Sequence, residues 1–259
     1  MGADREGTAR FEGRFDGKVA VITGAASGMG RETALRLASE GASVFGVDVN
    51  AEGLAETGAQ ISGGKFESRV TDIRSRDECH AAVAEAVAAF GGIDVVANVA
   101  GVLRLAHLPD VTEDDFKLVF DVNVAGTLWM CQAAIPHLLE TRGNIVNVAS
   151  NAGLMGAAYQ AVYGSSKAAV VNLTRCLAME YVKSKIRVNC VAPGGVDTPM
   201  TAAGPLPEDV DWKLVAPYLG FRKMADPSEI AAVIAFVASD EARQLHGSIL
   251  SADSGLTAG

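Results

Sequence analysis

The sequence lacks any spacing of cysteines or histidines that would indicate a disulfide framework, a redox pair or a metal centre. Its four cysteines are scattered without a CxxC pair, so we interpret them as reduced thiols and expect a cytoplasmic protein. Its four histidines show no ligand spacing, and no metal site is predicted. No apolar run reaches membrane-spanning length, and the polar N-terminus does not resemble a signal peptide.

An excess of positive charge is also missing. Lysine and arginine number 22 against 31 aspartates and glutamates, and the net charge of −9 argues against nucleic acid or anionic membranes as partners. The 49% hydrophobic content is that of a globular protein, and 259 residues suit one α/β domain. We expect residues 1–15 to be a flexible extension and residues 16–259 to form a single domain.

Apolar, β-branched runs alternate with alanine-rich helical segments along the chain. This alternation predicts an α/β fold with a doubly wound parallel sheet of about seven strands and helices on both faces. Typical helices are Ala81–Phe90 and Ser228–Ala238, and two longer ones are expected at Thr112–Leu139 and Ala161–Lys183. The expected strands are Val19–Thr23, Ser43–Asp48, Lys65–Thr71, Val95–Asn98, Asn144–Ala149, Arg187–Ala192 and Ser248–Ser251.

A glycine-rich turn joins the first expected strand to a helix. The strand Lys18–Thr23 leads into the turn Gly24–Gly30, and the helical stretch Arg31–Glu40 follows. Glycines let the backbone approach a pyrophosphate, and a helix N-terminus offers free N–H groups and a positive dipole end. The order of strand, turn and helix therefore predicts a dinucleotide site, with a generic glycine turn as the alternative.

Asp48 ends the second expected strand. A carboxylate at this position can accept hydrogen bonds from the adenosine ribose hydroxyls and would repel the additional phosphate of NADP. Ser27 in the turn is uncharged, and Val49 and Asn50 follow the aspartate, so no basic residue offsets that repulsion. The sequence therefore predicts NAD as the preferred cofactor, unless Asp48 is simply a surface carboxylate at a strand end.

Tyr163 and Lys167 are four residues apart, and Ser150 precedes the tyrosine by thirteen. On a helix, positions i and i+4 share a face, so the lysine ammonium would stand beside the phenol and lower its pKa. Such a tyrosine can exchange a proton with an alcohol or a carbonyl, and the serine hydroxyl can bind the same oxygen. The set predicts carbonyl/alcohol redox chemistry. The alternatives are a solvated helix face for the pair and a simple cap for Ser150.

These motifs together resemble the short-chain dehydrogenase/reductase family in its single-domain form of roughly 250 residues. The resemblance covers about residues 17–256 and implies a Rossmann-type fold. Thr23–Gly30 matches the family's cofactor turn, and Asn98–Gly101 resembles its NNAG segment, with Val99 in place of the second asparagine. Asn123 matches the asparagine of the catalytic tetrad, and Pro193-Gly194 with Thr198 matches the turn and threonine at the nicotinamide.

The resemblance implies roles for individual residues. Tyr163 is expected to be the general acid/base, Lys167 to hold the nicotinamide ribose, Ser150 to orient the substrate oxygen, and Asn123 to hold a water that relays protons towards Lys167. Asp72 resembles the adenine contact, although a helix N-cap is an alternative. The expected cofactor contacts are Gly24, Ser27, Gly28, Met29, Gly30, Asp48, Asp72, Ile73, Asn98, Ala100, Gly101, Tyr163, Lys167, Pro193, Gly194, Val196 and Thr198.

A proline-broken stretch at residues 194–225 interrupts the alternation and is expected to be a substrate lid, or else a helix pair packed onto the domain. This lid segment carries several large apolar residues. With Leu103, Leu154 and Met155, its residues from Met200 to Phe221 would line a mainly apolar pocket. The substrate is therefore expected to be a secondary alcohol or ketone on a hydrophobic or cyclic skeleton.

The leading hypothesis is an NAD-dependent oxidoreductase that transfers a hydride between the cofactor and a secondary alcohol or ketone. The alternatives are an NADPH-dependent 3-oxoacyl thioester reductase and a non-catalytic NAD-sensing subunit. Because relatives commonly pair the two long helices, we expect a homotetramer, or else a dimer. The apolar residues expected to support this pairing are Leu118, Phe120, Leu128, Val170, Leu173 and Leu177.

Overall fold

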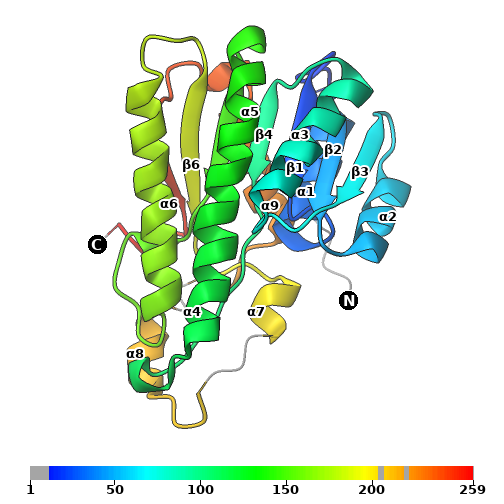
Figure 1. Cartoon of the computed structure of the whole chain (residues 1–259). Coiled ribbons are helices and arrows are strands. Elements are labelled where there is room, and N and C mark those ends of the chain that lie inside the picture. The colour runs from blue at the N-terminus through cyan, green and yellow to red at the C-terminus, as the bar shows by residue number, and fades with distance from the viewer. Residues whose placement is uncertain (1–11, 204–206, 219–221, 259) are drawn as a thin grey trace.

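A computed structural model describes residues 12–203, 207–218 and 222–258, and its centre is a parallel sheet of seven strands. The strand order is β3-β2-β1-β4-β5-β6-β7, which confirms the predicted doubly wound sheet (Figure 1). The observed strands are β1 Val19–Thr23, β2 Ser43–Asp48, β3 Phe66–Val70, β4 Val95–Asn98, β5 Asn144–Val148, β6 Arg187–Pro193 and β7 Ile249–Ala252.

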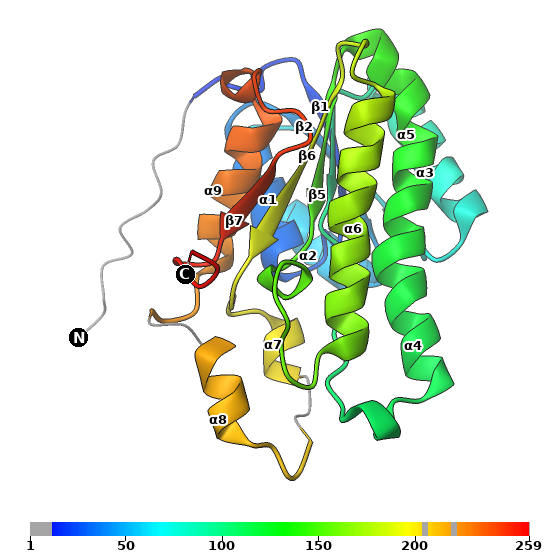
Figure 2. The ribbon, with the colours of Figure 1, turned by 90° about the vertical axis from the view of Figure 1, so that its left-hand side faces the viewer.

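Helices cover both faces of the sheet. Figure 2 shows α1 and α9 on one side of the strands and α5 and α6 on the other, where α3 packs beside α5. The short helices α7 and α8 lie beyond the ends of the strands in the same view. The helices are α1 Gly28–Ser39, α2 Ala51–Gln60, α3 Arg76–Phe90, α4 Glu113–Phe120, α5 Thr127–Thr141, α6 Ala161–Glu180, α7 Pro199–Ala203, α8 Trp212–Val215 and α9 Pro227–Ala238.

The central strands are apolar along their whole length because both of their faces are covered. Every residue of β1, β4 and β5 is buried, as expected for a parallel sheet between two helical layers. Ile22 and Leu37 belong to the core on the α1 side, and Ile145 and Met130 to the core on the α5 side. Each such side chain contributes roughly 1.5–3 kcal/mol when it leaves water, so the two cores hold the strand ends in place.

The helix that begins at Glu113 runs without a break to Thr141. Its middle turn, Asp121–Gly126, is wider than an α-helix and joins α4 to α5. The helix has 29 residues and its most apolar window has a mean hydropathy of 1.4, so by length and composition it could cross a membrane. This differs from the expectation that no segment is long enough. Half of the most apolar window is buried inside the protein, and core helices commonly meet the same criteria.

The folded domain begins before residue 16, earlier than expected. Phe15 is 2% exposed and belongs to the core on the α1 side, and its N–H donates to the Glu40 carbonyl at 2.8 Å. Arg14 forms an ion pair at 2.6 Å with the buried carboxylate of Glu40, which also pairs with Arg36. A buried carboxylate needs such partners. The predicted flexible extension is therefore wrong for residues 12–15, and residues 1–11 lie outside the described part of the chain.

Candidate active site

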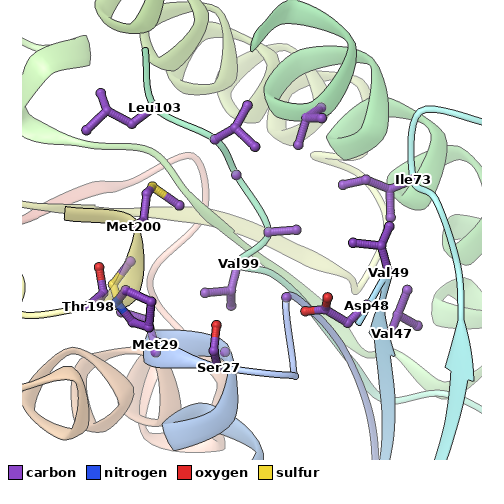
Figure 3. A pocket seen from close by; sticks show the side chains of 18 of the residues that line it. Ser27, Met29, Val47, Asp48, Val49, Ile73, Val99, Leu103, Thr198 and Met200 are labelled. Carbon is purple, nitrogen blue, oxygen red and sulfur yellow. The ribbon is translucent and has the colours of Figure 1, made fainter. Parts of the chain in front are cut away.

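A cavity of about 590 Å³ opens at the carboxyl ends of β1, β2 and β4 (Figure 3). β1 lies between β2 and β4 in the sheet. The connection after β1 therefore leads towards one edge of the sheet and the connection after β4 towards the other, so the loops after these two strands separate. Parallel sheets bind ligands at such a point. The lining residues are Gly24, Ser27, Gly28, Met29, Gly30, Val47, Asp48, Val49, Thr71, Asp72, Ile73, Arg74, Val99, Ala100, Gly101, Val102, Leu103, Arg104, Leu118, Val122, Thr198, Pro199 and Met200.

The glycine turn fits the phosphates of a dinucleotide. Gly24 has a φ of +73°, and a Cβ on Gly30 would overlap the carbonyl oxygen of Gly24. Only glycine therefore permits this close approach of turn and helix. Ser27 is the N-cap of α1, but its side chain makes no capping hydrogen bond and points into the cavity (Figure 3). The hydroxyl and the free N–H groups of the first turn can bind an anion there.

Asp48 is held by the backbone around it. Its Oδ2 accepts the N–H of Ala26 at 3.1 Å, and its Oδ1 accepts the N–H of Asn50 at 3.0 Å. The carboxylate points into the cavity beside Val47 and Val49 (Figure 3). A carboxylate fixed in this way keeps lone pairs for hydrogen-bond donors of a ligand.

Asp72 forms an ion pair with Arg74 at the adenosine end of the cavity. The guanidinium donates from Nε at 2.9 Å and from Nη2 at 2.5 Å to Oδ2 of the carboxylate. This hydrogen bonding lowers the pKa of Asp72 and raises that of Arg74. Sequence reasoning missed Arg74 and also Arg104, although both follow strand ends within a few residues. Ile73, between the two charged residues, lines the same wall.

Asn98 is not among the residues that line the cavity, and its role as a cofactor contact stays a prediction. Its amide is buried and donates to Oδ1 of Asn147 at 2.9 Å, and Asn147 donates to the hydroxyl of Thr174 at 2.9 Å. This network joins β4 and β5 to α6. The following residues are held instead by Thr23, whose hydroxyl accepts the N–H groups of Val99 and Ala100 at 3.0 and 3.1 Å.

Three more expected contacts, Lys167, Pro193 and Val196, also lie outside the described cavity walls. Pro193 ends β6, and Val196 is buried, where its carbonyl accepts the hydroxyl of Thr201 at 2.8 Å. Thr198 does line the cavity, and it lies within van der Waals reach of a Cβ built on Gly28. Pro193 and Val196 therefore shape the turn that brings Thr198 to the cavity.

A second, smaller cavity of about 140 Å³ contains the expected serine and tyrosine. Ser150 follows β5, and its Oγ accepts the N–H of Ala152 at 3.2 Å and donates to Oδ1 of Asn151 at 3.1 Å. Tyr163 lies in the first turn of α6. The lining residues are Leu103, Ser150, Asn151, Ala152, Met155, Ala157, Gln160, Tyr163, Gly194, Gly195, Thr201 and Tyr218.

The pKa of Tyr163 is raised, not lowered as the spacing suggested. Burial raises it, and a hydrogen bond with Ser150 opposes the rise only in part. Lys167 is buried too, and burial lowers the pKa of its ammonium to about 8. Its Nζ donates to the carbonyl of Val148 at 3.0 Å and lies 5.8 Å from the centre of the tyrosine ring. The two side chains share a helix face, but the loss of solvation is the largest cause of both pKa shifts.

Asn123 lies in the wide helical turn and connects three segments. Its Oδ1 accepts the N–H of Val102 at 2.8 Å, and its Nδ2 donates to the Val102 carbonyl at 3.0 Å and to Oγ of Ser166 at 2.9 Å. Ser166 in turn donates to the carbonyl of Tyr163 at 2.7 Å. Irregular turns of this kind are frequent at functional sites. Here the turn fixes the loop after β4 against the helix that carries the tyrosine.

The smaller cavity is less apolar than predicted. Leu103, Met155 and Tyr218 line it, but Leu154 is exposed and does not. Polar side chains that sequence reasoning overlooked, Asn151 and Gln160, complete the wall. Their only sequence indication was that each lies close to an expected catalytic residue. Two members of the predicted lid, Leu206 and Phe221, lie outside the described residues.

A set of contacts around Tyr159 fastens the lid segment to the rest of the site. Tyr159 has a φ of +64°, which is rare for an aromatic residue, and its ring meets His107 edge-on at 4.9 Å. Its carbonyl accepts the N–H of Ala106 at 3.1 Å, and its hydroxyl accepts the N–H of Asp211 at 2.9 Å. His107 also pairs with Asp209 at 2.8 Å, which lowers the pKa of that carboxylate. We call these contacts the Tyr159 clasp.

Among the residues that the structure describes, no cluster of potential metal ligands occurs. The arrangement consists instead of a phosphate-sized turn, a fixed carboxylate and a serine–tyrosine–lysine group. The turn and the carboxylate line the larger cavity, and the serine and the tyrosine line the smaller one. Leu103 lines both cavities, which therefore adjoin. This geometry suits a nucleotide cofactor beside a small substrate.

Comparison with known proteins agrees with this geometry. The family model for short chain dehydrogenases matches residues 18–208, and the chain belongs to that family. The chain is 39% identical over 246 residues to the 3-oxoacyl-[acyl-carrier-protein] reductase FabG of Thermotoga maritima, covering 94% of this chain and 99% of that protein.

Two further proteins are similar over almost the whole chain. Meso-2,3-butanediol dehydrogenase of Serratia marcescens is 37% identical, covering 95% of this chain and 96% of the enzyme. The crystal structure of a short chain dehydrogenase from Mycobacterium paratuberculosis bound to NAD superposes with a TM-score of 0.89 at 33% identity, covering 95% of this chain and 100% of that one. The protein is therefore an oxidoreductase of a family that binds a nicotinamide cofactor.

Proposed function

We propose that the protein is an NAD-dependent dehydrogenase or reductase that acts on a secondary alcohol or ketone. The observation that carries the proposal is Asp48, whose carboxylate is fixed by two backbone N–H groups and points into the larger cavity. Among the residues that line this cavity, the nearest basic side chain in sequence to the aspartate is Arg74, and Asp72 already pairs with it. The net charge at the ribose end therefore favours NAD over NADP.

The residues of the smaller cavity would carry the proton. When bound, the nicotinamide supplies or accepts the hydride. Tyr163 would give its phenolic proton to a carbonyl oxygen, or take a proton from an alcohol, and Ser150 would hold that oxygen by a hydrogen bond. Lys167, whose pKa of about 8 allows it to exist in both forms near neutral pH, would bind the nicotinamide ribose. Asn123 holds the loop that closes this side of the site.

Titration of the purified protein with NAD and with NADP by calorimetry tests the proposed preference for NAD. We expect NAD to bind at least about tenfold more tightly, a difference of about 1.4 kcal/mol. Asp48→Asn should reduce that preference, because it removes the charge but keeps the shape and one acceptor oxygen. Asp77→Asn, at an exposed position on α3, is the matched control. Equal affinities of the wild-type protein for the two nucleotides would sink the proposal.

A second candidate is an NADPH-dependent 3-oxoacyl thioester reductase, which the 39% identity to FabG favours. Asp48 opposes it, because the carboxylate would repel the additional phosphate. The two candidates differ in both cofactor and substrate. Reduction of an acetoacetyl thioester with NADPH at a higher kcat/KM than any simple ketone with NADH would establish the second candidate in place of the first.

A non-catalytic NAD-sensing subunit is the remaining alternative from a different class. A sensor needs the glycine turn and Asp48 but not a buried serine, tyrosine and lysine in one group. Ser150 and Tyr163 line a cavity of their own, and this favours catalysis. Nucleotide binding without turnover of any alcohol or ketone would favour the sensor instead.

For assembly we propose a homotetramer, with a dimer as the alternative, built on α4, α5 and α6. The supporting surface differs from the one expected, because Val170 and Leu177 are buried and Leu118 lines the larger cavity. The exposed apolar residues on and beside these helices are Phe116, Leu139, Met179 and Val182. Light scattering at micromolar concentration tests the proposal, and a stable monomer contradicts it.

We also propose a cytoplasmic location, which rests on the cysteines. Cys79, Cys131, Cys176 and Cys190 are all free thiols in the structure, and burial raises the pKa of three of them. Fractionation of the native host tests it, and recovery of the protein in a membrane or extracellular fraction would count against it.

A further inference from the structure

The smaller cavity carries hydrogen-bonding groups for which the proton chemistry has no use. Gln160 and Tyr218 line it together with the serine and tyrosine, and Asn151 lines it next to Ser150 in the sequence. Gln160 is the N-cap residue of α6, yet its side chain makes no capping hydrogen bond. These three polar side chains come from two separate segments of the chain and meet at one small space.

The same groups lack protein partners. Within the part of the chain that the structure describes, no hydrogen bond involves the amide of Gln160, the hydroxyl of Tyr218 or the Nδ2 of Asn151. Thr201 differs, because its hydroxyl already donates to the carbonyl of Val196 at 2.8 Å. Polar groups in a partly closed pocket that lack protein partners are available to a ligand, and a ligand that leaves them unpaired binds more weakly.

The position of Asn151 indicates where a second polar group of the substrate would lie. Its Oδ1 accepts a hydrogen bond of 3.1 Å from Oγ of Ser150, and Ser150 is the residue that would hold the reacting oxygen. Asn151 is hydrogen-bonded to Ser150, which would itself bind that oxygen, so the amide of Asn151 lies close to the reacting group. A hydroxyl on the carbon next to the reacting carbon would lie within its reach.

The size of the cavity limits the substrate. Its volume is about 140 Å³, against about 590 Å³ for the larger cavity. A space of this size suits a small substrate, such as a vicinal diol or hydroxyketone of about four carbons.

We propose that Asn151, Gln160 and Tyr218 determine specificity for a small substrate that has a second hydroxyl beside the reacting carbon, that is, an α-hydroxyketone or the corresponding vicinal diol. The proposal rests on the proposed function, because it names the substrate class of the same site. It differs from the expectation of an apolar or cyclic skeleton.

A matched pair of ketones tests it: 3-hydroxy-2-butanone and 2-butanone, which differ by one hydroxyl. We expect the wild-type protein with NADH to have a kcat/KM at least about tenfold higher for the hydroxyketone, which corresponds to one good hydrogen bond. The oxidation of 2,3-butanediol against 2-butanol with NAD should show the same preference.

Two variants test whether polar side chains of the cavity wall cause the preference for the hydroxyketone. Gln160→Met keeps the length of the side chain, and Tyr218→Phe keeps its ring, while each removes the polar group. Each should lower kcat/KM for 3-hydroxy-2-butanone several-fold, while kcat/KM for 2-butanone changes less than about twofold. Gln60→Met and Tyr181→Phe, whose side chains do not line the cavity, are the matched controls and should leave both ketones unaffected.

Equal kcat/KM for the two ketones, or equal losses for both in the variants, would overturn the inference. It would also be overturned by turnover of a long-chain acyl thioester or a steroid with turnover of neither small ketone, and the proposed oxidoreductase would then remain. Failure to turn over any ketone or alcohol with either cofactor would overturn the proposed function itself.

Discussion

The two cavities of the site are built in different ways. The larger one, the nucleotide half, is formed mainly by the backbone of the Gly24–Gly30 turn and by residues that directly follow strands β2, β3 and β4. The smaller one, the substrate half, is formed by side chains from the loop after β4, from residues 150–163, from the turn after β6 and from the lid segment. Backbone geometry is required of any chain that binds the nucleotide, whereas side chains can differ without a change of fold.

The difference extends to how each half is held. The nucleotide half is fixed by backbone N–H groups, such as those of Ala26 and Asn50 that bind Asp48. The substrate half depends on side chains that hold loops in place, namely the Tyr159 clasp and Asn123. Substitutions in the two halves should therefore have different consequences, and the following predictions test this from the largest expected effect to the smallest.

Gly30→Ala should damage the nucleotide half most. The new Cβ would overlap the carbonyl of Gly24, and backbone-to-backbone overlap is relieved only if the turn opens. We expect a loss of stability of about 3 kcal/mol, the upper end of the usual cost of overpacking, and loss of measurable NAD binding, checked by thermal unfolding with and without NAD. Gly156→Ala, where a Cβ meets open space, is the control. Normal NAD affinity in the Gly30 variant would contradict the role given to the turn.

Tyr163→Phe should abolish most catalysis while both halves stay intact. The ring and its packing remain, and only the proton-carrying hydroxyl is lost. Turnover should fall by about 10²-fold or more, with NAD affinity and stability nearly unchanged. Tyr181→Phe, near the other end of α6, controls for the loss of a hydroxyl. If the variant kept more than roughly a third of wild-type turnover while chemistry is rate-limiting, Tyr163 would not be the acid/base.

Lys167 should make stability depend on pH. Burial lowers its pKa from 10.5 to about 8, so between these values the unfolded chain holds a proton that the folded chain has released. Stability should then rise with pH in this window, by at most about 1.4 kcal/mol per unit.

The measurement compares urea unfolding of the wild-type protein with that of Lys167→Met between pH 8 and 10.5. The variant should lack the rise that this lysine contributes, while the exposed-site control Lys183→Met should keep it. Parallel stability profiles for the wild-type protein and the Lys167 variant would show that the lysine is not desolvated as described.

Tyr159→Phe should have the smallest effect and should be confined to the substrate half. The substitution removes the hydroxyl that accepts the N–H of Asp211 but keeps the ring against His107. We expect KM for the ketone to rise a few-fold, in line with one hydrogen bond of about 1 kcal/mol, while NAD affinity does not change. Steady-state kinetics and calorimetry measure the two. A change in NAD affinity as large as that in KM would mean that the two halves are not separable.

Local sequence predicted most of the fold. Five strands start where expected, at Val19, Ser43, Val95, Asn144 and Arg187, because buried parallel strands are largely continuous apolar runs. The half-exposed β3, with the sequence FESRV, has ends that differ by one residue from the expectation. Phe15 was misplaced because nothing in its neighbouring residues indicates that Glu40, 25 positions later, accepts its N–H.

The candidate site was predicted unevenly for the same reason. The turn glycines and Asp48 line the larger cavity, and their positions follow from the turn and the end of one strand. The direction of the Asn98 side chain and the polar groups Asn151 and Gln160 were not predicted, because each depends on which side chains the fold brings together.

The sequence by itself determined the parallel sheet, the glycine turn, and a tyrosine and a lysine on one face of a helix. These follow from the period of apolar residues and from the steric demands of glycine, which act over a few residues. Only the tertiary structure decided that burial raises the pKa of Tyr163, lowers that of Lys167, and leaves polar groups around the substrate cavity. Solvation and long-range contacts set these properties, and both exist only after the chain has folded.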